Sequence, residues 1–215
     1  MKAIDLTHLI TPQMPVYPGC KAPIFSPATT LEDDGFRETR LQFDSHTGTH
    51  MDAPAHLLPN APTLDTLPAE HFMGRAVVVN CKNLPLGGRI SLTHLAPYER
   101  AMEQADFILF HTGWDRQFHN PSYFHNFPTP EEAVVKQLVQ TGMKGVGIDA
   151  ISIDPVGAET YPNHHILLEA GLVIIENLTR LDQIGSDCFF CALPLLYQNS
   201  DGAPVRAVAL LEDEV

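Results

Sequence analysis

Apolar and polar residues along the chain alternate in short runs, and longer periodic stretches lie between these runs. Runs rich in apolar and β-branched residues predict strands at 2–6, 37–45, 75–80, 106–111, 145–149, 172–176, 188–193 and 204–211. Stretches with helical periodicity predict helices near 93–104, 130–141 and 164–170. Strands and helices interleaved in this order predict an α/β fold with a mixed sheet.

Local signals mark the ends of two of these helices. Thr129 as N-cap, Pro130 in the first turn and Glu132 three residues after the cap form a capping box for the helix at 130–141. Asn163 is expected to cap the next helix and Gly171 to end it.

Turn-forming residues predict how other elements are connected. The sequence Asn199-Ser200-Asp201-Gly202 favours a hairpin between the last two strands. The proline-rich segments 11–27 and 54–68 are expected to be irregular loops, because proline cannot donate a backbone hydrogen bond.

The run Leu172-Val173-Ile174-Ile175 contains no polar residue, which is typical of a strand buried on both faces. Glu176 follows it directly. A carboxylate at this point is costly unless it is ionised against a metal or another cation, or the strand end reaches water. The residues themselves leave both a metal ligand and a solvated strand end open.

Residues 46–56, HTGTHMDAPAH, contain three histidines and one aspartate. On an α-helix, at about 100° per residue, His46 and His50 would share a face, but Asp52 and His56 would point away from it. On an extended chain all four positions have even parity and lie on one side. An extended segment can therefore gather all four side chains, whereas a single helix cannot.

The residues before this segment continue the same alternation. Leu41 and Phe43 are apolar and odd, whereas Gln42 and Asp44 are polar and even. We therefore expect a strand whose odd face packs on the core and whose even face carries the site.

His46, His50 and Asp52 can offer two nitrogen ligands and one oxygen ligand to a single divalent ion. Gly48 leaves space between the two histidines and lets the backbone bend. Three protein ligands leave coordination positions open, which is typical of a catalytic site. Zn²⁺ suits histidines combined with carboxylates and Mn²⁺ suits a more oxygen-rich site, so both metals stay open.

Composition narrows the classes of function. The chain has 215 residues, of which 44% are hydrophobic, and no linker-like segment divides it, so we expect one domain over 1–215. The formal net charge of −13 argues against binding to nucleic acid or to an anionic membrane and favours a small-molecule partner. The sequence shows no long apolar run and no signal-like start, so we expect a soluble cytoplasmic protein.

The motif His46-x-Gly-Thr-His50-x-Asp52-Ala-Pro-x-His56 resembles the signature of the metal-dependent cyclase family, which includes bacterial kynurenine formamidases, isatin hydrolases and some polyketide cyclase-like proteins. Similar stretches extend over most of the chain: Asp5-Leu6-Thr7-His8, Pro15-Val16-Tyr17-Pro18-Gly19, Thr112-Gly113-Trp114, Gly147-Ile148-Asp149, Ser152-Ile153-Asp154-Pro155, and His164-His165 with the later Glu176. The resemblance implies the swivelling β/β/α fold of this family, usually assembled as a homodimer or tetramer.

The resemblance also implies a set of metal ligands. His46, His50 and Asp52 would hold a first divalent metal. Asp52 would bridge to a second metal held by His164 and Glu176, which lie twelve residues apart. We therefore expect one or two metals, Zn²⁺ or Mn²⁺, per chain. Only this spacing distinguishes His164 from the histidine next to it.

Two further residues gain a role from the resemblance. His56 would be the general acid/base, although its position also suits a further ligand or a residue that orients a ligand. Tyr17 stands where the formamidases have a tryptophan that packs on an aromatic substrate, and it keeps a flat face of smaller area. We expect Tyr17 to bind substrate, with a surface aromatic as the alternative. Other candidates for pocket walls are Phe25, Phe36 and Trp114.

Metal-dependent hydrolysis of a small amide, formamide or lactam, similar to that of an arylformamidase, fits these residues best. A lyase or isomerase could use the same metal to stabilise an enolate. A non-catalytic binding protein of the same fold is a third possibility, but a structural metal site is normally closed by a fourth ligand and needs no spare base.

Overall fold

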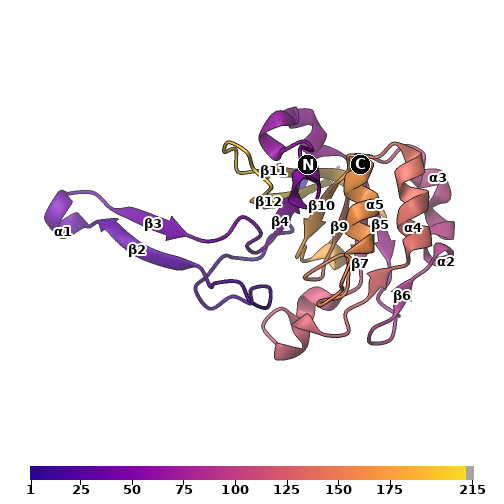
Figure 1. The fold of residues 1–215 in the computed structure, drawn as a ribbon, viewed down its shortest axis with the longest axis horizontal. Helices are drawn as coiled ribbons and strands as arrows, with labels where there is room; N and C mark the ends of the chain where they lie inside the picture. The colour runs from indigo at the N-terminus through magenta and orange to yellow at the C-terminus, as the bar shows by residue number, and fades with distance from the viewer. Residues whose placement is uncertain (212–215) are drawn as a thin grey trace.

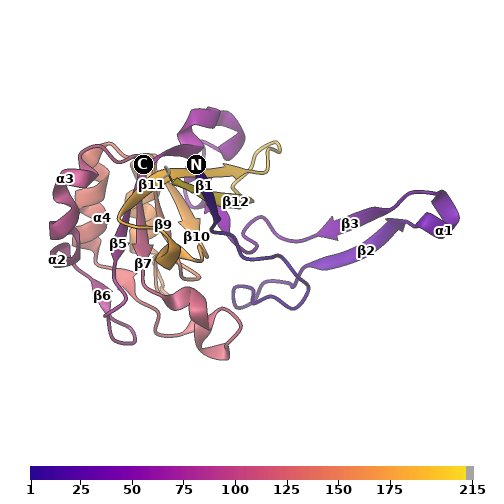
Figure 2. The same cartoon turned by 180° about the vertical axis from the view of Figure 1, so that it is seen from behind.

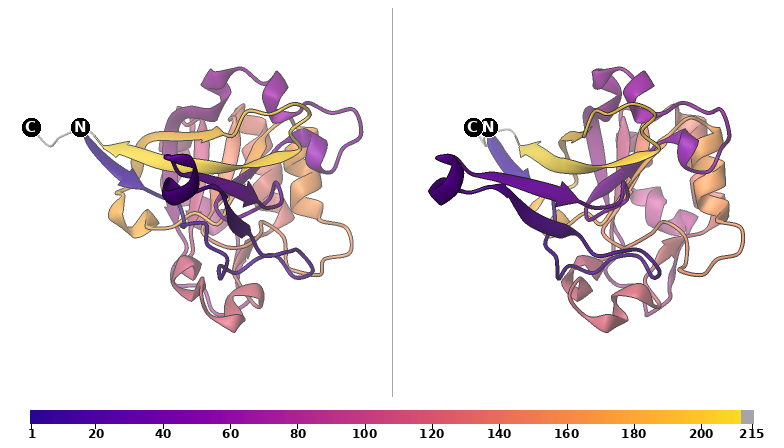
Figure 3. Two further views of the ribbon diagram at one scale, coloured as in Figure 1. Left: turned by 90° about the vertical axis from the view of Figure 1, so that its left-hand side faces the viewer. Right: turned by 60° about the vertical axis from the view of Figure 1, so that its left-hand side comes forward.

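One mixed sheet forms the framework of the computed structural model, which describes residues 1–211. Its strands are β1 (Lys2–Asp5), β4 (His50–Asp52), β5 (Met73–Asn80), β7 (Phe107–His111), β9 (Gly145–Ile148), β10 (Val173–Glu176), β11 (Asp187–Pro194) and β12 (Gly202–Leu211). They follow the order β1-β12-β11-β5-β7-β9-β10-β4, and β4 also pairs with β12, so the sheet closes into a barrel-like ring (Figure 3). The expected α/β fold with a mixed sheet is confirmed.

Strands β5, β7, β9 and β10 run parallel to one another, and the remaining pairs in the sheet are antiparallel. Alternate residues of the parallel strands enter two separate cores. Leu109 and Ile175 belong to the core inside the ring, whereas Phe110 and Ile174 belong to the core under the helices. The strand predicted at 172–176 is therefore buried on both faces, as expected.

Helices cover the outer face of the parallel strands (Figures 1 and 2). They are α2 (Leu92–Leu95), α3 (Glu99–Met102), α4 (Glu132–Leu138) and α5 (Pro162–Glu169). The single helix expected at 93–104 is wrong, because a 3₁₀ turn at Ala96–Tyr98 separates α2 from α3. Pro97 lies in this turn, where its missing N–H prevents a continuous helical ladder.

The capping box expected for α4 is also wrong. Thr129–Pro130 form a short strand, β8, which pairs with β6 (Arg89–Ile90). Pairing holds this backbone extended, so Glu131 is the N-cap and the helix begins two residues later than expected. The helical path continues through a 3₁₀ turn to residue 141, the predicted end.

Helix α5 begins earlier than its sequence suggests. Tyr161 is the N-cap, in a left-handed conformation (φ 44°, ψ 56°), and Pro162 is the first helical residue. The side chain of Asn163, the expected cap, instead donates to the carbonyls of Pro130 and Ile153. Gly171, at φ 79°, follows the helix end as predicted.

A long hairpin projects from the body (Figures 1 and 2). This arm, residues 24–42, contains β2 (Ile24–Thr29), α1 (Leu31–Asp34) and β3 (Glu38–Gln42). The expected strand at 37–45 therefore exists in part, but its predicted core face is wrong: Leu41 is 56% exposed. The loop expected at 11–27 likewise ends in β2.

The remaining connections carry short 3₁₀ segments at Pro54–His56, Leu64–Thr66, Ala69–Phe72, Trp114–Gln117, Pro121–Phe124 and Leu181–Gln183. The hairpin predicted between β11 and β12 is confirmed. Within residues 1–211, no helix is both long and apolar enough to cross a membrane.

Candidate metal centre

The candidate ligands lie at the seam where β4 closes the sheet. In the register of this seam His50 stands opposite Glu176 of β10, and Asp52 stands opposite Gly202 of β12. Met51 points into the core of the ring, so its neighbours His50 and Asp52 point outward, onto the face that α5 covers. Strand pairing alone therefore brings the side chains of His50 and Glu176 together.

The imidazole of His50 is oriented by a backbone carbonyl. Its Nδ1 lies 2.8 Å from the carbonyl oxygen of Gly48, which can only accept, so the proton is on Nδ1. The lone pair of Nε2 is then free to bind a cation. This nitrogen lies 3.3 Å from Oδ1 of Asp52 and 3.5 Å from Oε2 of Glu176.

His164 reaches the same cluster from the first turn of α5. Asp154 accepts hydrogen bonds from the amides of Asn163 and His164 and lies 2.8 Å from Nδ1 of His164. Nε2 of His164 therefore points away from Asp154, to within 3.4 Å of Glu176 and 3.7 Å of Asp52. A carboxylate that orients a histidine in this way is common at metal sites. The neighbouring His165 faces solvent and pairs with Glu169.

The donor set fits a divalent cation. Oδ2 of Asp52 is buried and has no hydrogen-bond partner among the described residues. Metal–ligand bonds of about 2.0–2.2 Å put two ligands of a tetrahedral ion about 3.3–3.6 Å apart. The N···O distances in this cluster, 3.3 to 3.7 Å, are close to that separation and longer than ordinary hydrogen bonds.

His46 and His56 adjoin the other side of Asp52. Nδ1 of His46 lies 2.7 Å from Oδ1 of Asp52, and its Nε2 lies 3.0 Å from Asp201. The His56 ring lies 4.0 Å from the His46 ring and 6.2 Å from the His164 ring, measured between centroids. Donor atoms of His46, Asp52 and His56 lie within 4.8 Å of one another, so this group could also hold an ion.

The three histidines and the aspartate of residues 46–56 do not lie on one strand. His46 lies in a turn, His50 and Asp52 in β4, and His56 in a 3₁₀ turn that follows Pro54. The even-parity strand expected through all four residues is therefore wrong. Their side chains nevertheless converge, since the His46 ring lies 5.2 Å from the His50 ring and 4.0 Å from the His56 ring, measured between centroids.

Charge in the cluster favours a bound cation. Burial lowers the pKa of His46, but Asp52 and Asp201 outweigh it and raise the pKa to about 9. Burial likewise opposes the charge on His164, yet Asp154, Glu176 and Asp52 raise its pKa to about 10. Burial raises the pKa of Asp52, but His46 and His50 hold it well below its usual range. The carboxylates thus attract positive charge, which a metal can supply.

His56 differs from these residues. It is only partly buried, and burial lowers the pKa of its imidazole despite the opposing charge of Asp52.

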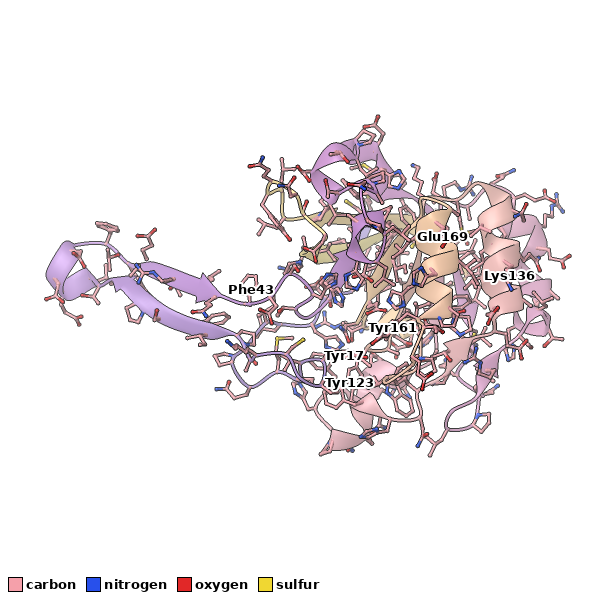
Figure 4. The ribbon with its side chains drawn as sticks, viewed as in Figure 1. Tyr17, Phe43, Tyr123, Lys136, Tyr161 and Glu169 are labelled. Atoms are coloured by element: carbon pink, nitrogen blue, oxygen red, sulfur yellow. The ribbon has the colours of Figure 1, made fainter. Side chains whose placement is uncertain are left out.

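A cavity of about 330 Å³ opens onto the cluster. Apolar side chains of Val16, Leu57 and Ile151 line its wall, together with Tyr17 and Tyr161. The two tyrosines lie side by side next to α5 (Figure 4), and burial and a hydrogen bond to Tyr161 raise the pKa of Tyr17. The pocket thus has a floor of candidate metal ligands and a partly aromatic wall.

The sequence did not reveal several residues in this pocket and next to its ligands. Tyr161 carries no motif, but its left-handed conformation directs its ring to within 6.0 Å of the His164 ring. Asp201 is distant in sequence from His46, its partner. The other proposed wall residues lie elsewhere: Phe25 and Phe36 are on the arm, and Trp114 is in the core under the helices.

Comparisons with known proteins identify relatives of this chain in both sequence and structure. The chain matches the Cyclase family over residues 4–155. A kynurenine formamidase of Salinibacter ruber is 30% identical, over 97% of each chain. Isatin hydrolase A from Labrenzia aggregata, solved with benzyl benzoate bound, is 25% identical with a TM-score of 0.85, over 97% of this chain and 93% of that one. A predicted metal-dependent hydrolase from Bacillus stearothermophilus is 30% identical with a TM-score of 0.81, over 97% of each.

Gly202 leaves room for His46, which gives a direct test of this residue. A Cβ at position 202 would lie 2.7 Å from Nε2 and 2.9 Å from Nδ1 of His46, so Gly202→Ala should displace the ring. We expect Zn²⁺ affinity to fall about 10–100-fold, the usual cost of disturbing a residue around a metal. Gly185→Ala is the matched control, because its Cβ would meet no atom within 4 Å. Unchanged affinity in Gly202→Ala, measured by chelator competition, would mean that the orientation of His46 does not matter to the metal.

Proposed function

Because the chain belongs to the Cyclase family, we propose that it is a metal-dependent hydrolase of a carbon–nitrogen bond other than a peptide bond, in a small amide, formamide or lactam. The observation that carries this proposal is the buried cluster of two carboxylates and two oriented histidines at the floor of a pocket. We propose further that residues 1–215 form a single domain with this activity.

The proposed ligands are His46, His50, Asp52, His164 and Glu176. The carboxylate of Asp52 lies close to all three of these histidines. They would hold one or two ions of Zn²⁺ or Mn²⁺, since the set offers both nitrogen and oxygen donors. A divalent metal bound there would polarise the substrate carbonyl and lower the pKa of a coordinated water from about 15.7 toward 7.

His56 is the proposed acid/base. It lines the cavity beside the cluster, and its partly exposed ring can reach a substrate in the cavity. In the proposed reaction the oxygen of water bonds to the carbonyl carbon and His56 takes the proton. His56 then donates this proton to the leaving nitrogen as the carbon–nitrogen bond breaks.

The pocket wall supports an aromatic substrate. Tyr17 and Tyr161 offer flat faces with polar hydroxyl groups, and both line the cavity. Relatives named kynurenine formamidase and isatin hydrolase support an aryl formamide or a cyclic aryl amide as the substrate class.

Hydrolysis is favoured over the enolate lyase and over a non-catalytic role. The relatives are named as a formamidase and as hydrolases, and these names support hydrolysis rather than either alternative. Incorporation of oxygen from labelled water into the product would distinguish hydrolysis from a lyase or isomerase reaction. The cytoplasmic location expected from the sequence stays a prediction.

A second copy of the chain is the proposed partner of the arm. The two strands of the arm pair only with each other, and an isolated two-stranded hairpin is marginally stable in water. The arm nevertheless exposes large apolar side chains, with Ile24, Leu31, Phe36 and Leu41 each more than half exposed. Burying these side chains requires another surface.

The body offers such a surface near the base of the arm. Leu195 and Leu196, in the loop between β11 and β12, are 58% and 78% exposed, and this loop lies on the side from which the arm leaves (Figure 1). In a two-fold dimer each arm could pack on its partner, so every contact would be made twice. A homodimer, or a tetramer built from such dimers, is therefore the proposed assembly.

Substitution of a ligand and of the acid/base should give different results. His50→Ala should abolish both metal retention and hydrolysis of an aryl formamide and of isatin, since it removes a ligand. His56→Ala should retain metal, measured by mass spectrometry of metals, while kcat falls about 10²–10⁴-fold. Equal loss of metal in both variants would make His56 a ligand and transfer the acid/base role to another group.

Charge placed on the arm should break the assembly. We expect wild-type protein to elute with a mass that is a multiple of 23.7 kDa in light-scattering chromatography, and Phe36→Glu/Leu41→Glu to elute at 23.7 kDa. The control is Leu86→Glu, which alters an exposed leucine outside the arm, in the segment between β5 and β6, and should leave the mass unchanged. A monomeric wild type, or an arm variant with wild-type mass, would contradict the proposed interface.

A further inference from the structure

Asn177 has an unusual backbone for a buried residue. It follows Glu176 directly and has a left-handed conformation, with φ 57°, although only 2% of it is exposed. Such a conformation is uncommon outside glycine and has an energetic cost, which asparagine tolerates better than most residues. The other described non-glycine residues with positive φ are all exposed or only partly buried: Asn60, Asn126, Tyr161, Arg180 and Asn199.

Every polar group of Asn177 is hydrogen-bonded. Its backbone N–H donates to Ala150, and its carbonyl accepts from the Thr49 hydroxyl at 2.6 Å. In the side chain, Oδ1 accepts from the hydroxyl of Tyr123 at 2.7 Å, and Nδ2 donates to the carbonyl of Gly48 at 2.8 Å. These four bonds fix both the backbone and the side chain of Asn177.

The Gly48 carbonyl connects Asn177 to the metal cluster. This oxygen accepts from Nδ2 of Asn177 and also faces Nδ1 of His50, each at 2.8 Å. Gly48 itself has a left-handed backbone (φ 68°), and glycine restrains the direction of its carbonyl less than any other residue. A hydrogen bond from another residue is therefore needed to hold the Gly48 carbonyl in the direction in which it accepts from Nδ1 of His50.

We propose that Asn177 is a positioning residue for the metal centre. Through Gly48 it fixes the tautomer and ring orientation of His50, and through its own backbone it fixes the strand end that carries Glu176. One residue thus holds the two facing ligands in register, His50 through its side chain and Glu176 through its backbone. Tyr123, whose ring is fully buried, holds the Asn177 side chain through the hydrogen bond from its hydroxyl to Oδ1. This inference rests on the proposed function only in requiring that the cluster bind a metal.

A structural role alone would predict a different outcome. If Asn177 merely relieved strain in a turn, its replacement would lower the stability of the metal-free protein without altering the ligands. Glycine adopts a left-handed backbone without steric cost, so Asn177→Gly preserves the turn and removes only the side-chain hydrogen bonds. The geometry and affinity of the bound metal then report on the positioning role.

The test measures Zn²⁺ affinity by competition with a chromophoric chelator, and the absorption spectrum of the Co²⁺-substituted protein. We expect Asn177→Gly to bind Zn²⁺ about 10–100-fold more weakly than wild type and to give an altered Co²⁺ spectrum. Asn126→Gly makes the same change at an exposed left-handed asparagine, with φ 57°, and should match wild type in both measurements.

Tyr123→Phe provides a second variant in case Asn177→Gly does not fold. It removes only the hydroxyl that holds Oδ1 of Asn177, so we expect a smaller loss of Zn²⁺ affinity in the same direction. Wild-type affinity and a wild-type Co²⁺ spectrum in the folded variants would overturn the positioning role and leave the metal site intact. Absence of Zn²⁺ binding by the wild-type protein would instead overturn the proposed metal site, and this inference with it.

Discussion

The burial of two carboxylates, Asp52 and Glu176, is the main physical constraint at the seam of the barrel, because their charge must be compensated. Both are almost fully buried, and an isolated charge in such a place is strongly unfavourable. The protein surrounds them with histidines rather than with lysine or arginine. Because His50 and His164 each engage Nδ1 elsewhere, their Nε2 atoms can bind a metal together with the carboxylates. This arrangement explains why so much polar surface is buried next to a pocket.

The closure of the sheet determines where the ligand side chains point. Strand β4 is only three residues long, yet it pairs with β10 on one side and β12 on the other. Its central residue Met51 fills the core of the ring, which fixes the outward direction of His50 and Asp52. Packing of an apolar residue thus determines where two polar ligands point. The contacts of Asp154 and Asn177 then set the remaining orientations.

Sequence patterns predicted the strands of the main sheet and the candidate ligands better than they predicted the segments that connect them. The apolar run before Glu176 predicted a strand buried on both faces, because every position in it is hydrophobic. Alternation at Leu41 and Phe43 predicted a core strand, but every residue of β3 is exposed in the structure. Periodicity indicates that one face of a strand is apolar, and it does not identify the surface on which that face packs.

The spacing of the histidines identified the cluster, although not its local structure. The residues that orient the ligands were harder to find, because Asn177 and Asp201 act on residues more than a hundred positions away in the sequence. Tyr161 precedes a proline, where an extended backbone is the usual expectation, so its left-handed conformation had no signal in the sequence. Only Asp154 could have been anticipated, from its place in the Ser152-Ile153-Asp154-Pro155 stretch.

Anomalous X-ray diffraction at the zinc and manganese absorption edges tests the central claim most directly. Crystals of the protein, grown without chelator, should show a strong anomalous peak in contact with the Asp52 carboxylate and with Nε2 of both His50 and His164. A second peak on the His46 side of Asp52 would indicate two metals per chain. Loaded crystals without any peak next to Asp52, or with metal held only by other residues, would contradict the account.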